Sequence, residues 1–312
     1  MLDNNHMTRT ISLIEAVPYL RAYANQIFVV KVGGELMEDP ELLNFMARDI
    51  AILHRLQIKV VVVHGGGPQL DRLTKQLGNE VTRVAGRRVT SPEVLDAAKM
   101  VFRGQLSLEL VAALTKHGER AVGLCGADGV LVQADKRPTV MVTSDSGEKI
   151  DVDYGEVGDV KAVNPDVIHS ILETGAIPVI SPLASDETGR ILNVNADTMA
   201  VEIAIAVKAS KCLLCTNVPG ILADINDSTS LLHYTDLPEL DELDERGAFS
   251  EGMRPKVAAI ARAIEGGVPR VHVVQSSRVG AIIEEVFTTD GCGTLVVRSK
   301  EETAPEDLVL HK

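Results

Sequence analysis

The sequence contains no tryptophan, and only 3% of its residues are aromatic. Because 45% of the residues are nevertheless hydrophobic, the core must be built from valine, leucine, isoleucine and alanine. Such side chains suit parallel strands that are buried on both faces beneath alanine-rich helices. The 312 residues suffice for a well-buried core, either in one large α/β unit or in two lobes.

A basic surface is also missing, since 31 lysines and arginines face 44 aspartates and glutamates and the net charge is −13. Nucleic acids and anionic membranes bind basic surfaces, so we expect neither as a partner. No apolar run has the length of a membrane span, and the first ten residues lack the core of a signal peptide. An acidic chain can still hold a local basic site for a phosphorylated small molecule.

Cysteines are few, and two of the four form a C-x-x-C pair, Cys212 and Cys215. The pair lies in an apolar run that predicts a buried strand. Residues three apart on a strand point to opposite faces, which disfavours shared metal binding or a disulfide. We therefore favour buried, reduced thiols over a redox or zinc site, and we expect a cytoplasmic protein.

Short apolar runs alternate with longer amphipathic stretches along the chain. The predicted strands are residues 27–32, 59–64, 121–124, 177–181, 211–216 and 270–274, and the predicted helices are 40–56, 68–77, 91–117, 165–173, 198–207 and 255–265. This alternation predicts an α/β three-layer sandwich with a central, mostly parallel sheet. Residues 130–157 predict β-hairpins. Residues 12–23 predict an additional N-terminal helix, kinked at Pro18, which packs on its own domain or is exchanged with another subunit.

Two glycine-rich turns follow predicted strands. Residues 29–34 read Val-Val-Lys-Val-Gly-Gly and place Lys31 just before Gly33 and Gly34. Residues 63–68 read Val-His-Gly-Gly-Gly-Pro and place Gly65 and Gly66 before a helix. Glycines let backbone N–H groups approach an anion, and a helix N-terminus attracts one. Each turn alone is best interpreted as a tight connection, but two of them at strand ends favour phosphate binding. Neither matches a P-loop or a dinucleotide fingerprint.

Further polar residues occur at the borders of predicted helices. Arg88 in Gly-Arg-Arg-Val-Thr can capture a carboxylate through two hydrogen bonds, although an isolated arginine pair is usually a solvated surface. Asn193 and Asn195 occupy alternate positions and share one face, and Asp197 begins a helix, where an N-cap is the simpler interpretation. Lys256 lies in the first turn of a helix, against the helix dipole, which an anionic ligand would explain.

Taken in order, these segments resemble the amino-acid kinase family, and within it the N-acetylglutamate kinases. The resemblance covers nearly the whole chain, and Val-Pro-Gly-Ile-Leu at residues 218–222 and Gly-Met-x-Pro-Lys at residues 252–256 extend it. It implies the amino-acid kinase fold, an N-terminal helical arm at 1–24, an amino-acid substrate lobe at 25–188 and a nucleotide-binding lobe at 189–312. It implies ATP-dependent phosphorylation of the side-chain carboxylate of N-acetyl-L-glutamate, with Mg²⁺, in arginine biosynthesis.

The resemblance also implies a role for each matching residue. Lys31 and Lys256 would stabilise the transferred phosphoryl group, and Asp197 would position both lysines. The implied substrate-binding residues are Gly65, Gly66, Arg88, Asn193 and Asn195, and the implied phosphate- or nucleotide-binding residues are Gly33, Gly34, Val218, Gly220, Gly252 and Met253. An arginine effector site is implied at Tyr19, His272, Glu285 and Gly293, in a homo-oligomer that is a hexamer or a dimer.

Some residues depart from the family pattern and keep alternatives open. Glu35 follows the first glycine pair, Arg87 replaces an apolar residue before Arg88, and Asn217 replaces a common aspartate. These departures affect the identity of the substrate more than the type of reaction. A kinase for aminoadipate or glutamate held on a carrier protein would use a basic rim, which Arg83, Arg87 and Arg103 could form. A non-catalytic amino-acid sensor with the same fold is a third interpretation, and the retained lysines and aspartate argue against it.

Overall fold

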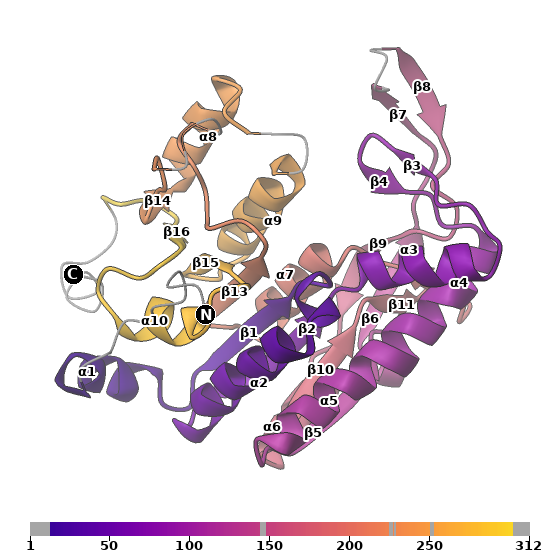
Figure 1. Ribbon diagram of the computed structural model, residues 1–312. Helices are drawn as coiled ribbons and strands as arrows, with labels where there is room; N and C mark the ends of the chain where they lie inside the picture. The colour runs from indigo at the N-terminus through magenta and orange to yellow at the C-terminus, as the bar shows by residue number, and fades with distance from the viewer. Residues whose placement is uncertain (1–12, 144–147, 225–226, 228, 250–252, 302–312) are drawn as a thin grey trace, which may run out of the picture.

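The computed structural model describes residues 13–143, 148–224, 227, 229–249 and 253–301. Its centre is an eight-stranded sheet in the order β14-β16-β15-β13-β1-β2-β10-β5 (Figure 1). The strands are β1 (Ile27–Val32), β2 (Lys59–His64), β5 (Ala121–Cys125), β10 (Ile177–Ser181), β13 (Lys211–Thr216), β14 (Tyr234–Asp236), β15 (Val271–Gln275) and β16 (Thr294–Val297). Neighbouring strands run parallel except β15 and β16, which are antiparallel. The expected fold class is confirmed.

Helices cover both faces of this sheet. One face packs against α2 (Pro40–Arg55), α3 (Gly67–Gln76), α4 (Pro92–Ala98), α5 (Ser107–Lys116) and α10 (Ala281–Phe287). The other packs against α6 (Asp166–Glu173), α7 (Ala196–Ala206), α8 (Leu237–Glu245) and α9 (Arg254–Glu265). Shorter helical segments are the 3₁₀ turns η2 (Leu36–Glu38) and η4 (Asp128–Val130) and the π-helical η3 (Lys99–Leu106). None of the described helices has the length and apolar character needed to cross a membrane.

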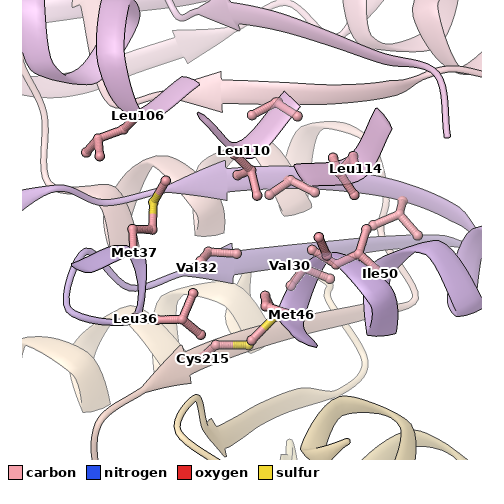
Figure 2. Packing of buried hydrophobic residues seen from close by; sticks show 14 of the residues in the cluster. Val30, Val32, Leu36, Met37, Met46, Ile50, Leu106, Leu110, Leu114 and Cys215 are labelled. Atoms are coloured by element: carbon pink, nitrogen blue, oxygen red, sulfur yellow. The ribbon is translucent and has the colours of Figure 1, made fainter. Parts of the chain in front are cut away.

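The strands of the sheet are buried on both faces. In β1, Val30 and Val32 pack against the first set of helices, whereas Val29 packs against the second. Figure 2 shows the first of these cores, where Val30 and Val32 lie near side chains of α2 and α5 such as Ile50 and Leu110. Because strand side chains alternate, Lys31 shares the face of Val29, beneath α7.

A smaller layer lies beyond the carboxyl ends of the central strands. Its sheet has the order β12-β11-β6-β9. The hairpins β3–β4 and β7–β8 project together at the same end (Figure 1). The bounds are β3 (Arg83–Val84), β4 (Arg87–Arg88), β6 (Val132–Lys136), β7 (Val140–Thr143), β8 (Lys149–Val152), β9 (Gly158–Val163), β11 (Leu183–Ser185) and β12 (Ile191–Asn193). The predicted β-hairpin in 130–157 is thus present as β7–β8.

One predicted helix needs correction, and several elements were not predicted. Residues 91–117 were expected to form one α-helix, but the middle of this stretch is the π-helical η3. The sequence also gave no indication of α8, α10, β14 or β16. The N-terminal helix is present as α1 (Leu13–Tyr23), and it packs against α10 of its own chain, with Tyr19 and Tyr23 buried. Exchange of this helix with another subunit stays a prediction, and Ser12, at the start of the predicted helix, lies outside the described residues.

Candidate active site

The two glycine-rich turns meet at the carboxyl end of the sheet. Because β1 and β2 are parallel neighbours, both turns leave the sheet at the same edge. The backbone N–H of Gly65 donates to the Val32 carbonyl at 2.8 Å. A Cβ built on Gly34 would lie 2.8 Å from the backbone N and Cα of Gly66, so only a residue without a side chain fits there. The backbones of the two turns therefore touch, directly before the first turn of α3.

A buried histidine braces the second turn. His64 Nδ1 lies 2.9 Å from the Gly65 carbonyl oxygen, and Nε2 lies 3.0 Å from Ser181 Oγ on β10. Ser181 in turn donates to the carbonyl of Phe102, inside the π-helical segment. Burial lowers the pKa of His64 to about 4, so the imidazole is neutral at neutral pH. The motif's histidine thus links three elements rather than facing a ligand.

An aspartate joins two lysines on the other side of the turns. Asp197 Oδ1 lies 2.9 Å from Lys31 Nζ of β1, and Oδ2 lies 3.2 Å from Lys256 Nζ of α9. Asp197 is held in the first turn of α7 because Asn195 caps this helix, its Oδ1 accepting from the N–H groups of Asp197 and Thr198. The N-cap is therefore Asn195, not Asp197 as the simpler interpretation had it, and the amide oxygen of Asn195 is engaged by the backbone.

The charge balance of this group favours an ionised aspartate. Burial alone would raise the pKa of Asp197, but the two lysines outweigh it and lower the pKa to about 2. One carboxylate thus faces two ammonium groups, which leaves a local excess of positive charge beside the glycine turns. An anion such as a phosphoryl group is the ligand that this excess favours.

Arg88 approaches the same space from the β3–β4 hairpin. Its Nη2 donates to the Gly67 carbonyl at 2.9 Å and lies 2.7 Å from Asp71 Oδ1 on α3. Asp71 Oδ2 accepts from Arg83 at 2.8 Å. The Arg88 side chain is 89% buried, since 11% of it is exposed, and burial lowers its pKa while Asp71 raises it. A guanidinium held in this way has few rotamers left, which suits it to recognise a carboxylate.

Asn193 lies at the end of β12, near Arg88. Its Nδ2 donates to Thr90 Oγ1 at 3.1 Å. Thr90 is fully buried, and its backbone N–H donates to the Tyr154 carbonyl while its carbonyl accepts from the N–H of Glu156. The threonine of the Arg-Val-Thr motif therefore orients Asn193. Asn193 and Asn195 both line the cavity, and the cap of α7 engages only Oδ1 of Asn195.

These residues enclose a cavity of about 790 Å³. Nine of the site residues predicted from the sequence line it: Lys31, Gly34, Gly65, Gly66, Arg88, Asn193, Asn195, Asp197 and Lys256. Gly33 lies behind them against the Cys215 carbonyl, and Val218, Gly220 and Met253 do not line the cavity. Gly252 lies outside the described residues. Glu35 is exposed and does not line the cavity either.

The residues proposed for an arginine site form a second buried cluster. His272 Nδ1 lies 2.8 Å from Glu285 Oε1, and Glu285 Oε2 accepts from the N–H of Gly293 at 2.8 Å. Lys211, which the sequence did not single out, lies 3.0 Å from His272 Nε2. The hydroxyl of Tyr19 lies 3.5 Å from Thr289 Oγ1. Burial lowers the pKa of His272 to about 4.

Comparison with known proteins agrees with this arrangement. Residues 26–275 match the model of the amino acid kinase family. The chain belongs to this family. Acetylglutamate kinase of Myxococcus xanthus is 44% identical over 292 residues, covering 93% of this chain and 95% of that protein. Acetylglutamate kinase of Desulfitobacterium hafniense is 44% identical, covering 91% of this chain and 95% of that protein. The resemblance stated from the motifs is confirmed.

Several solved structures have a fold similar to that of this chain. N-acetylglutamate synthase from Neisseria gonorrhoeae, complexed with coenzyme A and N-acetyl-glutamate, has a TM-score of 0.80 at 26% identity. It covers 93% of this amino acid kinase, which in turn spans 64% of the longer synthase chain. Giardia carbamate kinase shares the fold, with a TM-score of 0.65 at 17% identity, covering 88% of this chain and all of that one.

Several side chains around the cavity were not predicted. Asp71, Thr90 and His64 hold residues that were predicted, but each acts through a partner distant in sequence. Arg262 and Glu202 form a two-point ion pair between α9 and α7, with contacts of 2.7 and 3.0 Å. No local pattern reveals such pairs, because they depend on how the helices pack.

Proposed function

We propose that this amino acid kinase transfers the γ-phosphoryl group of ATP to the side-chain carboxylate of N-acetyl-L-glutamate. The product is N-acetyl-L-glutamyl 5-phosphate, and the reaction belongs to arginine biosynthesis. The observation that carries this proposal is the contact of Asp197 with Lys31 and Lys256 in a cavity that Arg88 and Asn193 also line. Relatives named acetylglutamate kinase match the chain over nearly its full length, which supports this substrate.

Phosphoryl transfer to a carboxylate requires neutralisation of charge rather than transfer of a proton. A carboxylate is already a nucleophile at neutral pH, so a general base is not needed. Two anions must instead be brought into line, and phosphoryl transfer is promoted mainly by alignment and electrostatic stabilisation. Lys31 and Lys256 supply positive charge, and the backbone N–H groups of Gly34 and Gly66 supply hydrogen bonds. Asp197 acts as a spacer that sets the distance between the lysines.

The two ends of the substrate need different partners. In this proposal the side-chain carboxylate lies toward the glycine turns, and the α-carboxylate meets Arg88. Asn193, oriented by Thr90, contacts the acetylated amino group. The glycine turns follow β1 and β2, which form one half of the central sheet together with β5 and β10, and Arg88 lies in β4. This supports the assignment of 25–188 to the substrate and 189–312 to the nucleotide, although Asn193 and Asp197 come from the boundary between them.

The magnesium ion of such a reaction is proposed to arrive with the nucleotide. Within the described residues there is no group of three or more side chains suited to hold a metal. The carboxylates that line the cavity are engaged already, Asp197 by the lysines and Glu202 by Arg262. Mg²⁺ commonly keeps most of its waters and binds through substrate phosphates, where it supplies further neutralisation of charge. The residues therefore fit MgATP better than a metal site of their own.

Arginine is proposed as an inhibitor of the enzyme. His272, Glu285 and Gly293 are in mutual contact, and Tyr19 brings α1 against the same region, as the sequence predicted for an effector site. A buried carboxylate such as that of Glu285 suits recognition of a guanidinium. Titration of L-arginine into the kinase assay tests this. Inhibition in the parent, weakened by Glu285→Gln, supports the site, and activity unchanged by excess arginine contradicts it.

A homo-oligomer is also proposed, either a dimer or a hexamer. β5 is an edge strand of the central sheet, and Val122 on it is exposed together with Leu108 and Met100 of the adjoining helices. Exposed apolar side chains at a sheet edge favour pairing with a second copy. A sizing profile of the full chain with and without arginine measures the assembly. The cytoplasmic location expected from the sequence remains a prediction.

The test of the function is a comparison of substrates. ADP release is measured with MgATP and N-acetyl-L-glutamate, L-glutamate or N-acetyl-L-aspartate. We expect turnover with N-acetyl-L-glutamate alone, because L-glutamate lacks the acetyl group and the side chain of N-acetyl-L-aspartate is one methylene shorter. Absence of turnover with all three contradicts the proposal. It would favour a carrier-bound substrate, for which the exposed Arg87 and Arg83 at the cavity rim provide a basic surface.

A further inference from the structure

Asp71 is an acidic residue that contacts Arg88, which lines the pocket for which we propose an anionic ligand. It lies on α3, and its two carboxylate oxygens have different partners. Oδ1 lies 2.7 Å from Arg88 Nη2, and Oδ2 lies 2.8 Å from Arg83 Nη2. One carboxylate therefore ties both strands of the β3–β4 hairpin to the helix that begins at the glycine turn.

The contacts of Arg88 with α3 use only one of its three guanidinium nitrogens. Its Nη2 is shared by Asp71 and the Gly67 carbonyl, both on or beside the first turns of α3. Its Nε is buried and has no hydrogen-bond partner among the residues that the structure describes. A buried N–H donor without an acceptor is costly, so an oxygen atom of a ligand is expected to meet it.

We propose that Asp71 is a positioning residue for the substrate. It holds the guanidinium of Arg88 by Nη2, and thereby turns the Nε–H toward the place of the α-carboxylate. Through Arg83 it also fixes the hairpin that carries Arg88. This inference rests on the proposed function, because it presupposes that Arg88 recognises a carboxylate of N-acetyl-L-glutamate.

The direction in which KM changes when Asp71 is replaced distinguishes this positioning role from a purely electrostatic one. By its charge alone, Asp71 repels an anionic substrate, so its removal would lower the KM for N-acetyl-L-glutamate. By positioning, Asp71 makes Arg88 a better partner, so its removal would raise that KM. An asparagine in its place keeps the shape and removes the charge. It cannot pair with both arginines, because it has no negative charge and one of its two terminal atoms is a donor nitrogen.

The test uses Asp71→Asn in the full chain, with Arg72→Gln as the matched control. Arg72 is the next residue of α3 and makes an exposed ion pair with Glu38 at 3.0 Å. We expect Asp71→Asn to raise the KM for N-acetyl-L-glutamate roughly tenfold, while the KM for ATP and kcat change by less than about threefold. Arg72→Gln is expected to behave as the parent. An unchanged or lowered KM for N-acetyl-L-glutamate overturns the inference.

A double variant tests whether Asp71 acts through Arg88. In an Arg88→Lys background, Asp71→Asn is expected to add less than about twofold to KM, because the group that it positions is already gone. A full additional tenfold rise would mean that Asp71 acts elsewhere, and would overturn the inference. Should Asp71→Asn fail to fold, Arg83→Gln removes the other arm of the bridge at an exposed side chain. A two- to fivefold rise in the same KM supports the inference, on the order expected for a loosened contact, and no rise overturns it.

Failure of the proposed function and failure of the positioning role of Asp71 give different results. A parent enzyme without turnover on N-acetyl-L-glutamate overturns the proposed function, and the role of Asp71 with it. A parent that turns over this substrate, together with an Asp71→Asn enzyme of parental KM, overturns the positioning role alone.

Discussion

The ammonium group of Lys31 lies 2.9 Å from the carboxylate of Asp197, and this contact joins the end of β1 to the first turn of α7. Since Lys256 shares the same carboxylate, one aspartate sets the place of both cations. The account makes these three residues the centre of phosphoryl transfer.

Removal of either partner is therefore expected to lower turnover without unfolding the protein. Lys31→Ala and Asp197→Ala should each reduce kcat by roughly 10²–10³, the scale of one lost charge-stabilising donor. Circular dichroism and thermal melting check that the fold is kept. Lys161→Ala, at an exposed ion pair with Glu187 on the surface, is the control and should keep parental turnover. Near-parental kcat in either active-site variant would contradict the role of these residues.

The buried histidine predicts a loss of stability in mild acid. The pKa of His64 is about 4 in the folded protein, against 6.5 for the exposed side chain. Below pH 6.5 His64 becomes protonated in the unfolded chain, whereas in the folded chain it stays neutral down to about pH 4. The contribution of neutral His64 to the free energy of unfolding is therefore complete above pH 6.5. It decreases by about 3 kcal/mol as the pH is lowered from 6.5 to 4. His272 has the same direction of shift and adds to the effect.

Urea unfolding between pH 7 and pH 4 measures this dependence. His64→Gln is expected to be less stable at pH 7, but its free energy of unfolding should fall less steeply toward pH 4. His169→Gln, at a partly exposed position on α6, is the control and should retain the parental slope. Equal slopes for the parent and His64→Gln would show that His64 takes up its proton in the folded state.

The contact between the two glycine turns predicts unequal effects of alanine. In Gly34→Ala the new Cβ would lie 2.8 Å from backbone atoms of Gly66, so the turns must separate. In Gly66→Ala it would meet the side chains of Phe102 and Leu106, which have more freedom to move. We expect kcat/KM to fall by roughly 10²-fold in Gly34→Ala, the scale of a misplacement near 1 Å, and by less in Gly66→Ala.

Gly104→Ala provides the control for this pair, because a Cβ there has no neighbour within 4 Å. It should keep parental kinetics and melting temperature. If Gly34→Ala were as active as Gly104→Ala, the backbones of the two turns would not be in contact in the working enzyme.

The four cysteines are predicted to be inert in the folded protein. All are free and buried, and burial raises the pKa of Cys215 to about 12 and that of Cys212 further. A thiol reacts as its thiolate, so a disulfide reagent at pH 8 should release colour only after denaturant is added. Rapid reaction of the native protein would contradict this, and would reopen the redox interpretation of the C-x-x-C pair.

Much of the central fold could be predicted because its strands are short, apolar and bounded by turns. Strands β1, β2, β10 and β13 begin and end where the pattern predicted. The π-helical segment was missed because its wider turn leaves the amphipathic pattern almost unchanged. The elements at the C-terminal edge of the sheet, such as β14 and β16, are only three or four residues long, which is too short for a period to appear.

The candidate site could be predicted where residues stand in motifs at the ends of strands or the starts of helices. Lys31, Asp197 and Lys256 are such residues, and parallel strands bring their ends together. The supporting residues could not be predicted, because Asp71 meets Arg88 only after the β3–β4 hairpin folds back over α3. Asn195 shows the limit of spacing arguments, since its role as the N-cap of α7 was not predicted.

The most direct test of the central claim is to trap the product. The enzyme is incubated with MgATP, N-acetyl-L-glutamate and hydroxylamine, and the hydroxamate formed is identified by mass spectrometry. The account predicts the hydroxamate of the side-chain carboxylate, formed in proportion to ADP and lost in Asp197→Ala. ADP release without a hydroxamate, or a hydroxamate at the α-carboxylate, would contradict phosphoryl transfer to the side chain of this substrate.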